Sequence, residues 1–354
     1  MKETIPVAVV GASGYSGEEL VRLLLGHPRA RLSAITSRRY SGTPLIEVFP
    51  RFAHLPAAQG LAFSKPDPER LAQEAAVALL ALPHGASAEI AVPLLEAGCR
   101  VIDLSADFRL RDPDTYLEYY GSEHPAPQWT SRAVYGLVEM YRNEIKDAQL
   151  VASPGCYPTS ILLPILPLLK ENMISMQDII ADSMSGASGA GRKEERQYLF
   201  VECNESLRPY SIPKHRHLSE MEQEIERIAG RAVVMQFTPH LVPVNRGMLT
   251  TLYLSPPASH SDRNRWHDWA ANLDRIYQAV FGAEPFVRLL GDRDLPDTKN
   301  VVGTNVIEIG WRLDPRSGRM IVVSALDNLL KGAGGQAIQS LNLLLGLPEI
   351  AGLI

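Results

Sequence analysis

Three evenly spaced glycines follow the first strand-like run of the chain, and no other feature constrains the fold as strongly. The run Ile5–Val10 is short, apolar and rich in β-branched residues, which is typical of a buried strand in a parallel sheet. Gly11, Gly14 and Gly17 come next, and Ser16–Leu25 has the apolar spacing of a helix. A tight glycine turn from a buried strand into a helix predicts the opening of a strand–helix–strand unit.

The next stretch of the chain repeats this alternation. A helix is expected at 86–97, and further strands are expected at 31–36, 76–82, 101–104 and 150–152. Strands that alternate with helices predict an α/β fold with a doubly wound parallel sheet and right-handed crossovers. Residues 112–135 are rich in Pro, Tyr and Asp and are expected to form a long excursion from this sheet.

The second half of the chain has a different pattern. Strand-like runs lie at 179–181, 233–237, 249–254, 306–311 and 320–325, and a final helix is expected at 334–345. This pattern predicts an α+β domain with a largely antiparallel or mixed sheet. A length of 354 residues also favours two domains.

Composition excludes several classes of protein. The formal net charge is −5 and no basic tract occurs, so we expect no nucleic-acid partner. The cysteines are Cys99, Cys156 and Cys203, which is too sparse a set for a disulfide framework and fits a reducing compartment. The longest apolar stretch, 161–169, is short and contains two prolines, so we expect no membrane span. These features predict a cytoplasmic protein.

The glycine turn itself predicts a ligand. Glycines at such a turn let the backbone approach a pyrophosphate, and the helix N-terminus offers free amides and partial positive charge. The spacing departs from G-x-G-x-x-G, but its place between strand and helix supports a dinucleotide site. The residues predicted to contact the cofactor here are Gly11, Ser13, Gly14, Tyr15, Ser16 and Gly17.

The end of the second strand indicates which dinucleotide binds. An NAD site usually has an acidic residue there to hold the ribose hydroxyls. Here the chain reads Ser37, Arg38, Arg39, a combination that suits a 2′-phosphate. We therefore predict NADP(H) as the cofactor, with these three residues in contact with it.

Cys156 occupies a second turn from a strand into a helix. It follows the strand at 150–152 and Ser153, and Pro158 fits a first helical turn. The positive end of a helix dipole lowers the pKa of a thiol and so activates it as a nucleophile. Cys99 and Cys203 lack this setting, and Cys99 is expected to be buried as a small apolar residue.

An imidazole is the natural proton carrier for thiol chemistry. His217 lies just before a predicted helix, and Glu220 follows it at a distance that suits orientation of the ring. His215, His240 and His84 are rivals that spacing alone does not separate. The His-x-His pair lacks carboxylate or cysteine ligands at zinc-site spacing, so no metal is expected.

Three further stretches carry groups suited to anions and cofactor. Arg109 follows the strand at 101–104 and has the chemistry to grip a phosphate. The glycine- and serine-rich stretch 185–192 offers amides for an anion nest beside the cofactor through Ser185, Gly186 and Gly189. Asn328, before the last helix, has the chemistry to bind a nicotinamide carboxamide.

In their order, these stretches resemble the N-acetyl-γ-glutamyl-phosphate reductases of arginine biosynthesis, from residue 5 to about residue 348. The matching segments are 11–17, 82–85, 105–109, 154–158, 185–192, 215–220 and 327–332. No one segment is decisive, but the ordered set is specific. The resemblance implies a Rossmann-type N-terminal domain and a catalytic domain of the glyceraldehyde-3-phosphate dehydrogenase type. The last helix is expected to return to the first domain. The expected first domain therefore comprises 1–155 and 327–354, and the expected catalytic domain comprises 156–326.

The resemblance also implies roles. Cys156 matches the nucleophile and His217 the acid/base, while Arg109, Ser153, Tyr210 and Glu220 match positions at the substrate. The implied reaction is NADPH-dependent reduction of N-acetyl-γ-glutamyl phosphate to the semialdehyde, with release of inorganic phosphate, through a thioester on Cys156. The implied assembly is a homodimer or homotetramer.

Three alternatives remain open at this point. An aspartate-semialdehyde dehydrogenase would run the same chemistry, but its cysteine normally follows an asparagine, where this chain has Gly155. A carrier-protein-linked aminoadipyl-phosphate reductase would need a basic surface, which a net charge of −5 does not support. A non-catalytic NADP-binding sensor would need the glycine turn but no reactive cysteine.

Overall fold

A computed structural model describes residues 4–192, 194–257 and 266–353, and these form two compact units. The first unit runs to Pro154 and resumes at Ala333, and the second comprises Gly155–Gly332. Residues 1–3, 193, 258–265 and 354 lie outside the described part.

The first unit contains a seven-stranded sheet in the order β3-β2-β1-β4-β5-β7-β6. All of its strand pairings are parallel, which confirms the predicted doubly wound sheet. Its strands are β1 (Ile5–Val10), β2 (Ala30–Thr36), β3 (Phe63–Ser64), β4 (Val77–Leu80), β5 (Arg100–Asp103), β6 (Ala133–Tyr135) and β7 (Leu150–Ala152). Its helices are α1 (Tyr15–Leu25), α2 (Leu45–Val48), α3 (Pro68–Glu74), α4 (Ala88–Glu96), α5 (Pro113–Tyr120), α6 (Val138–Lys146) and α12 (Gly335–Leu344).

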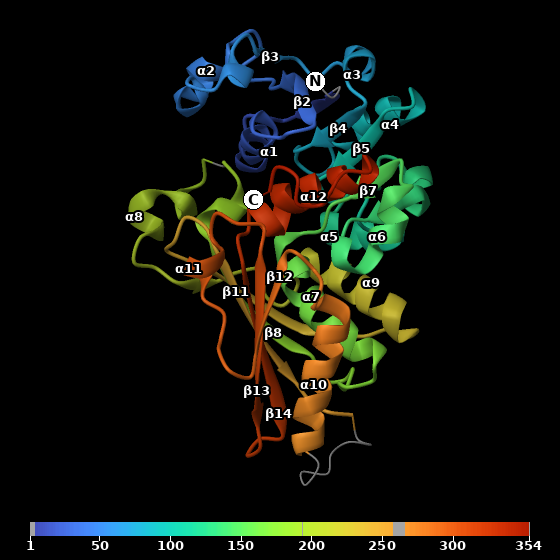
Figure 1. Ribbon diagram of the computed structural model, residues 1–354, viewed down its shortest axis with the longest axis vertical. Helices are drawn as coiled ribbons and strands as arrows, with labels where there is room; N and C mark the ends of the chain where they lie inside the picture. Colours follow the sequence, from blue (N-terminus) through green and yellow to red (C-terminus); the bar gives the residue numbers. More distant parts are fainter. Residues whose placement is uncertain (1–3, 193, 258–265, 354) are drawn as a thin grey trace. The chain divides into compact units, whose positions relative to one another are not determined.

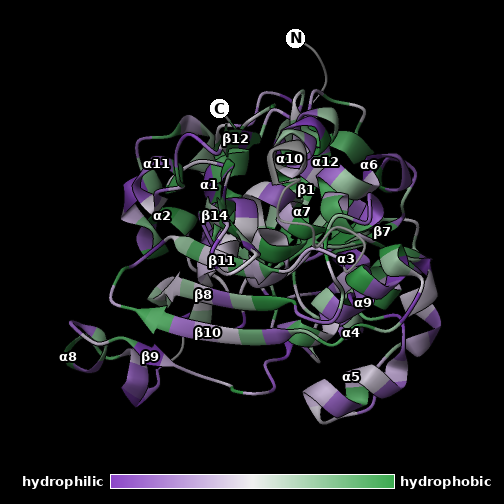
Figure 2. Ribbon diagram, turned by 90° about the horizontal axis from the view of Figure 1, so that it is seen from below, coloured by the Kyte–Doolittle hydropathy of each residue, from purple (hydrophilic) through white to green (hydrophobic). Residues whose placement is uncertain are grey.

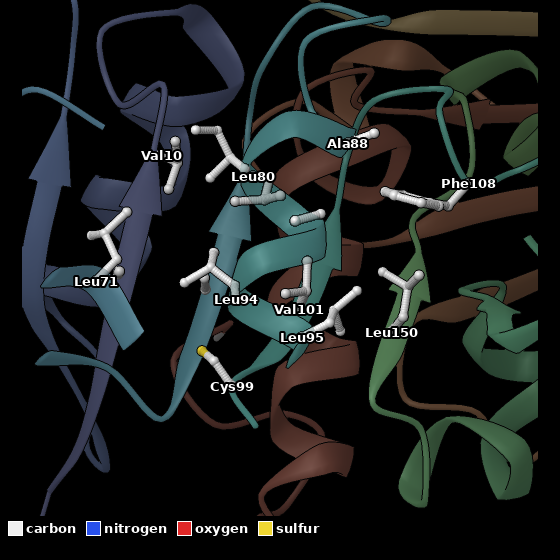
Figure 3. Packing of buried hydrophobic residues seen from close by; sticks show 14 of the residues in the cluster. Val10, Leu71, Leu80, Ala88, Leu94, Leu95, Cys99, Val101, Phe108 and Leu150 are labelled. Carbon is white, nitrogen blue, oxygen red and sulfur yellow. The ribbon is translucent and has the colours of Figure 1, made fainter. Parts of the chain in front are cut away.

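The core of this unit lies between the central strands and the helices beside them. Leu80 of β4, Val101 of β5 and Leu94 of α4 pack in one buried cluster, which Figure 3 shows from close by. Cys99 belongs to the same cluster and is 4% exposed. Burial raises the pKa of its thiol to about 11, so Cys99 is an inert core residue, as expected.

Four helices of this unit, α2, α3, α5 and α6, were not anticipated. Helix α5 falls inside the expected excursion at 112–135, and α3 lies before β4. Each begins with an aspartate cap and a first-turn proline, Asp112–Pro113 and Asp67–Pro68. That pair of residues is a known start signal for a helix and would have located both.

The second unit contains a mixed seven-stranded sheet in the order β12-β13-β14-β11-β8-β10-β9. Pairs β8–β10 and β12–β13 are parallel and the other four pairings are antiparallel, in line with the predicted α+β domain. Its strands are β8 (Ile180–Gly186), β9 (Arg208–Pro209), β10 (Gln236–Val242), β11 (Met248–Leu254), β12 (Val287–Gly291), β13 (Ile307–Asp314) and β14 (Arg319–Leu326). Along β10, which lies beside β8 in Figure 2, exposed or half-buried residues alternate with buried ones, as a sheet with two different faces requires.

Helices pack along one face of this sheet (Figure 1). They are α7 (Cys156–Lys170), α9 (His217–Ala229) and α10 (Trp266–Phe281), while α8 (Phe200–Cys203) and α11 (Thr298–Val301) are short. None of the helices within the described ranges is long and apolar enough to cross a membrane.

Helix α7 continues through Pro164, which is unusual for an interior proline. The missing N–H of Pro164 leaves the carbonyl of Ser160 without its helical donor. Ser324 of β14 donates its hydroxyl to that carbonyl at 2.7 Å. The side chain therefore satisfies the freed group and fixes α7, which begins at Cys156, against the sheet.

Candidate active site

Cys156 is the first residue of the 15-residue helix α7, and Gly155 caps that helix. The Cys156 side chain is half-buried, whereas Cys99 and Cys203 are buried. At the first turn of a helix the amide groups point toward the N-terminus and favour an anionic sulfur. The position therefore suits a nucleophile, as predicted for Cys156.

His217 contacts the residue that precedes Cys156. It opens α9, and a Cβ added to Gly155 would lie 2.7 Å from both Cε1 and Nε2 of its ring. Glu220, in the first turn of α9, is fully buried and accepts the backbone N–H of Gly155 at 3.0 Å. Its other oxygen lies 3.9 Å from Nε2 of His217. The fold thus brings together the start of α7, His217 and Glu220.

His215 has a different environment from His217. It is buried, and its Nδ1 accepts the backbone N–H of His217 at 3.1 Å, so it caps α9. Burial, followed by the nearby charge of Arg216, lowers the pKa of His215 to about 4. His215 is therefore neutral near pH 7 and serves as a hydrogen-bond acceptor. Of the rival imidazoles, His240 lies on β10 and His84 follows β4 in the first unit.

Two tyrosines, Tyr157 and Tyr210, lie beside His215 and His217. The hydroxyls of Tyr157 and Tyr210 share a hydrogen bond of 2.8 Å, and Tyr157 also bonds the side chain of Ser185. Burial raises the pKa of both phenols, so both stay protonated. The Tyr157 ring packs edge-on against His217, with ring centres 5.9 Å apart. Tyr210 is thereby linked to the residue that follows Cys156.

Asn328 joins two loops of the second unit. Its Oδ1 accepts the N–H of Gly247 at 2.9 Å, and its Nδ2 donates to the hydroxyl of Ser188 at 2.9 Å. Gly189 lies beside it, since an added Cβ would be 3.7 Å from Nδ2. The predicted residues Ser185, Gly186, Gly189 and Asn328 therefore lie in one region. Ser185 and Gly186 form the end of β8 rather than the expected loop.

Arg246 and Asp327 also belong to this region, and no sequence pattern indicated their pairing. The fully buried carboxylate of Asp327 lies 3.0 Å from Nε of Arg246. It also accepts the N–H of Gly303 at 2.8 Å and that of Leu329 at 2.8 Å. This pair anchors the segment that carries Asn328.

The predicted dinucleotide turn in the first unit packs closely against neighbouring backbone at Gly11 and Gly17. Gly11 has a φ of +81°, and an added Cβ would lie 2.4 Å from the Ala81 carbonyl oxygen. A Cβ on Gly17 would lie 2.3 Å from the Gly11 carbonyl oxygen. Above Gly14 the nearest atom would be 3.7 Å away, so space is left there. Tyr15, Ser16 and Gly17 open α1, where amides lack helical partners.

The end of β2 adjoins this turn. The hydroxyls of Ser13 and Ser37 lie 2.9 Å apart, and the hydroxyl of Thr36 accepts the N–H of Gly11. Arg38 and Arg39 come next and are exposed. The turn and the predicted cationic pair are therefore adjacent.

Arg109 is held at the carboxyl ends of β5 and β7. It is 8% exposed and donates to the carbonyls of Ser153 at 2.8 Å and Leu104 at 2.7 Å. Asp107 fixes the same loop by accepting the N–H groups of Ser87 and Ala88 at the start of α4. Within the described residues, no group of three or more His, Cys, Asp or Glu side chains is arranged to hold a metal ion.

Comparison with known families matches both units. A semialdehyde dehydrogenase NAD-binding domain matches residues 6–148, and a semialdehyde dehydrogenase dimerisation domain matches residues 156–328. Among curated proteins, N-acetyl-γ-glutamyl-phosphate reductases match from end to end. The protein from Akkermansia muciniphila is 53% identical over 99% of this chain and 98% of its own length. That from Alkaliphilus metalliredigens is 46% identical over the same shares.

Solved structures show the same fold. Aspartate semialdehyde dehydrogenase II of Vibrio cholerae, complexed with ASA, has a TM-score of 0.72 at 17% identity, covering 98% of this chain and 99% of that one. Aspartate semialdehyde dehydrogenase of Candida albicans, solved with NADP, has a TM-score of 0.69 at 16% identity, covering 96% and 98%. At this level of identity the likeness concerns the fold alone.

Proposed function

The chain belongs to the N-acetyl-γ-glutamyl-phosphate reductases of the semialdehyde dehydrogenase family, and from that premise we propose how it works. It is an oxidoreductase that reduces N-acetyl-γ-glutamyl phosphate to N-acetylglutamate semialdehyde and inorganic phosphate. NADPH is the reductant, and the acyl group passes through a thioester on Cys156. The observation that carries this assignment of roles is the contact of His217 with Gly155, directly before the cysteine.

The residues of the first unit fit a dinucleotide phosphate. The close packing beneath Gly11 and Gly17 contrasts with the open space above Gly14, which a pyrophosphate would occupy. Amides of Tyr15, Ser16 and Gly17 would face it. Ser37, Arg38 and Arg39 would hold the 2′-phosphate, because two guanidiniums favour that dianion over a bare ribose hydroxyl. When bound, NADPH supplies a hydride to the thioester carbon.

Acyl transfer is the first chemical step of the proposal. The Cys156 thiolate attacks the acyl carbon, a carbon–sulfur bond forms, and the bond from that carbon to the phosphate oxygen breaks. Inorganic phosphate leaves with the electron pair. Arg109 would bind the substrate's phosphate or its carboxylate, since its charge is held in place by two carbonyl contacts.

Proton transfer falls to His217. It accepts the thiol proton before attack and returns a proton to the oxygen that becomes negative during reduction. When the resulting thiohemiacetal collapses, His217 takes the hydroxyl proton back, the carbon–sulfur bond breaks with its electron pair going to sulfur, and the aldehyde leaves. Glu220 would orient the imidazole, and Tyr210 and Ser153 would line the substrate site. Asn328, with Ser185, Gly186 and Gly189, would hold the nicotinamide end of the cofactor.

Assembly and location follow the family expectation. The match to a dimerisation domain over 156–328 supports a homodimer or homotetramer. The proposed location is the cytoplasm, because the family resemblance implies a biosynthetic enzyme that acts on a small acyl phosphate.

The reverse reaction gives the cleanest test. Purified protein is offered N-acetylglutamate semialdehyde or aspartate semialdehyde, each with phosphate and with NADP or NAD, and cofactor reduction is followed by absorbance. The proposal predicts phosphate-dependent reduction of NADP with the acetylated substrate alone.

Other outcomes would contradict parts of the proposal. Activity with aspartate semialdehyde alone would move the chain to the aspartate-specific branch. Equal rates with NAD would overturn the role given to Arg38 and Arg39. If neither aldehyde supports cofactor reduction, two alternative functions remain: a carrier-linked aminoadipyl-phosphate reductase and a non-catalytic NADP-binding sensor.

A further inference from the structure

Two glycines of the second unit lie against the two side chains that the mechanism uses. Gly155 contacts the ring of His217, and Gly332 contacts Cys156. Both glycines are buried. We propose that Gly155 and Gly332 are positioning residues, whose missing side chains create the space in which His217 and Cys156 are held. The inference rests on the proposed function, because it assigns these residues a part in the same reaction.

The backbone at Gly155 does not require glycine. Its φ of −67° and ψ of 157° are open to any residue. Serine, asparagine or aspartate at a helix cap would add a side-chain hydrogen bond, and Gly155 provides none. A Cβ there would meet Cε1 and Nε2 of His217 at 2.7 Å and Cδ2 at 3.0 Å. The ring of His217 is therefore the group that excludes a side chain at this position.

The backbone of Gly155 is also held by Glu220. The hydrogen bond from its N–H to that buried carboxylate fixes the backbone at the start of α7. A Cβ at position 155 cannot avoid the His217 ring through a movement of the Gly155 backbone, because that movement would break this hydrogen bond. A side chain at 155 would instead displace His217 and so change its approach to Cys156.

Gly332 leaves space beside Cys156, as Gly155 leaves space for the ring of His217. A Cβ there would lie 2.8 Å from the Cβ of Cys156 and 3.3 Å from its Cα. Its φ lies outside the left-handed region, and its N–H is held by the Asp327 carbonyl at 3.0 Å. The close approach of two backbones, rather than an unusual conformation, explains the glycine.

Alkylation of Cys156 by iodoacetamide tests this without substrate or cofactor. The rate is measured against pH for the wild type, Gly155→Ala, His217→Ala and the double variant, with the modified peptide identified by mass spectrometry. The proposal predicts that Gly155→Ala shifts the pH profile of alkylation and, in a separate steady-state assay with substrate, slows turnover about tenfold or more. It also predicts that Gly155→Ala adds no further effect in the His217→Ala background.

The stability of the same proteins keeps the test informative if Gly155→Ala folds poorly. Removal of the ring makes room for the new Cβ, so His217→Ala should restore the melting temperature of Gly155→Ala. Gly332→Ala should slow alkylation, and His217→Ala should not rescue it. Gly26→Ala is the control, because its backbone is open and the nearest atom to its Cβ would be 3.9 Å away.

An unchanged alkylation profile in Gly155→Ala, or an equal effect with and without His217, would overturn the proposal. A wild type that alkylates normally but oxidises neither aldehyde would refute the proposed function, while the alkylation profiles would still decide the role of the glycines.

Discussion

The backbone N–H of Gly155 donates to the carboxylate of Glu220 at 3.0 Å, and the other carboxylate oxygen lies 3.9 Å from Nε2 of His217. One fully buried side chain from α9 thereby fixes the start of α7 and faces the imidazole. In the proposed mechanism, stability and proton transfer are therefore coupled through a single carboxylate.

Replacement of Glu220 should separate these two effects. Glu220→Gln keeps an acceptor for Gly155 but loses the charge beside His217, so kcat should fall roughly tenfold or more with little change in stability. Glu220→Ala leaves the buried N–H unsatisfied and should also lose about 1–3 kcal/mol of unfolding free energy. Urea unfolding and steady-state kinetics measure both. Glu224→Gln, equally buried on the same helix, should leave kcat unchanged.

His215 should make stability depend on pH. Its folded pKa of about 4 lies below the ordinary 6.5, so the unfolded chain binds a proton that the native protein does not. The contribution is complete above pH 6.5 and is lost as pH falls toward 4, by on the order of 3 kcal/mol. His215→Asn retains a capping acceptor without the titration. Unfolding curves at pH 4.5, 5.5 and 7 should show a flatter dependence in the variant, and parallel curves would refute this origin.

A methyl group at position 14 should leave the fold stable but weaken the complex with NADP. The nearest atom to an added Cβ is 3.7 Å away, whereas at Gly17 it is 2.3 Å. Gly14→Ala should therefore melt within a few degrees of the wild type yet bind NADP about tenfold or more weakly. Gly17→Ala should instead lose stability, because the contact is with backbone. Calorimetric titration that finds wild-type affinity in Gly14→Ala would contradict the placement of the pyrophosphate.

Asn328 should act on cofactor binding through two bonds that can be removed separately. Asn328→Ala leaves the N–H of buried Gly247 without its acceptor and should cost about 1–3 kcal/mol of stability as well as raise KM for NADP. Ser188→Ala removes only the bond to the neighbouring loop and should raise KM with little loss of stability. A normal KM in both variants would exclude this region from the cofactor site.

In the first unit the sequence predicted the elements with strong local signals and missed β3, β6 and four helices. Apolar β-branched runs located β1, β2 and β7, and glycine turns located the start of α1 and, in the second unit, the start of α7. Where a signal was short or shifted, the prediction erred. Strand β9 has two residues, and β10 runs from Gln236 rather than from Val233 because it pairs in register with β8.

The site depends on contacts between distant parts of the chain, which no local pattern encodes. Gly155 and Glu220 are 65 residues apart, and Arg246 and Asp327 are 81 apart. Sequence spacing predicted that an imidazole would serve Cys156 but left four candidates. The helix-capping bond of His215 and the contact of His217 with Gly155 distinguish two of them only in three dimensions.

The most direct test of the central claim is the mass of the intact protein after mixing with N-acetyl-γ-glutamyl phosphate in the absence of NADPH. The account predicts one N-acetylglutamyl group per chain, carried on Cys156, with one phosphate released for each group bound. It also predicts no adduct and no turnover in Cys156→Ala. Turnover that persists in Cys156→Ala, or an adduct on another residue, would contradict it.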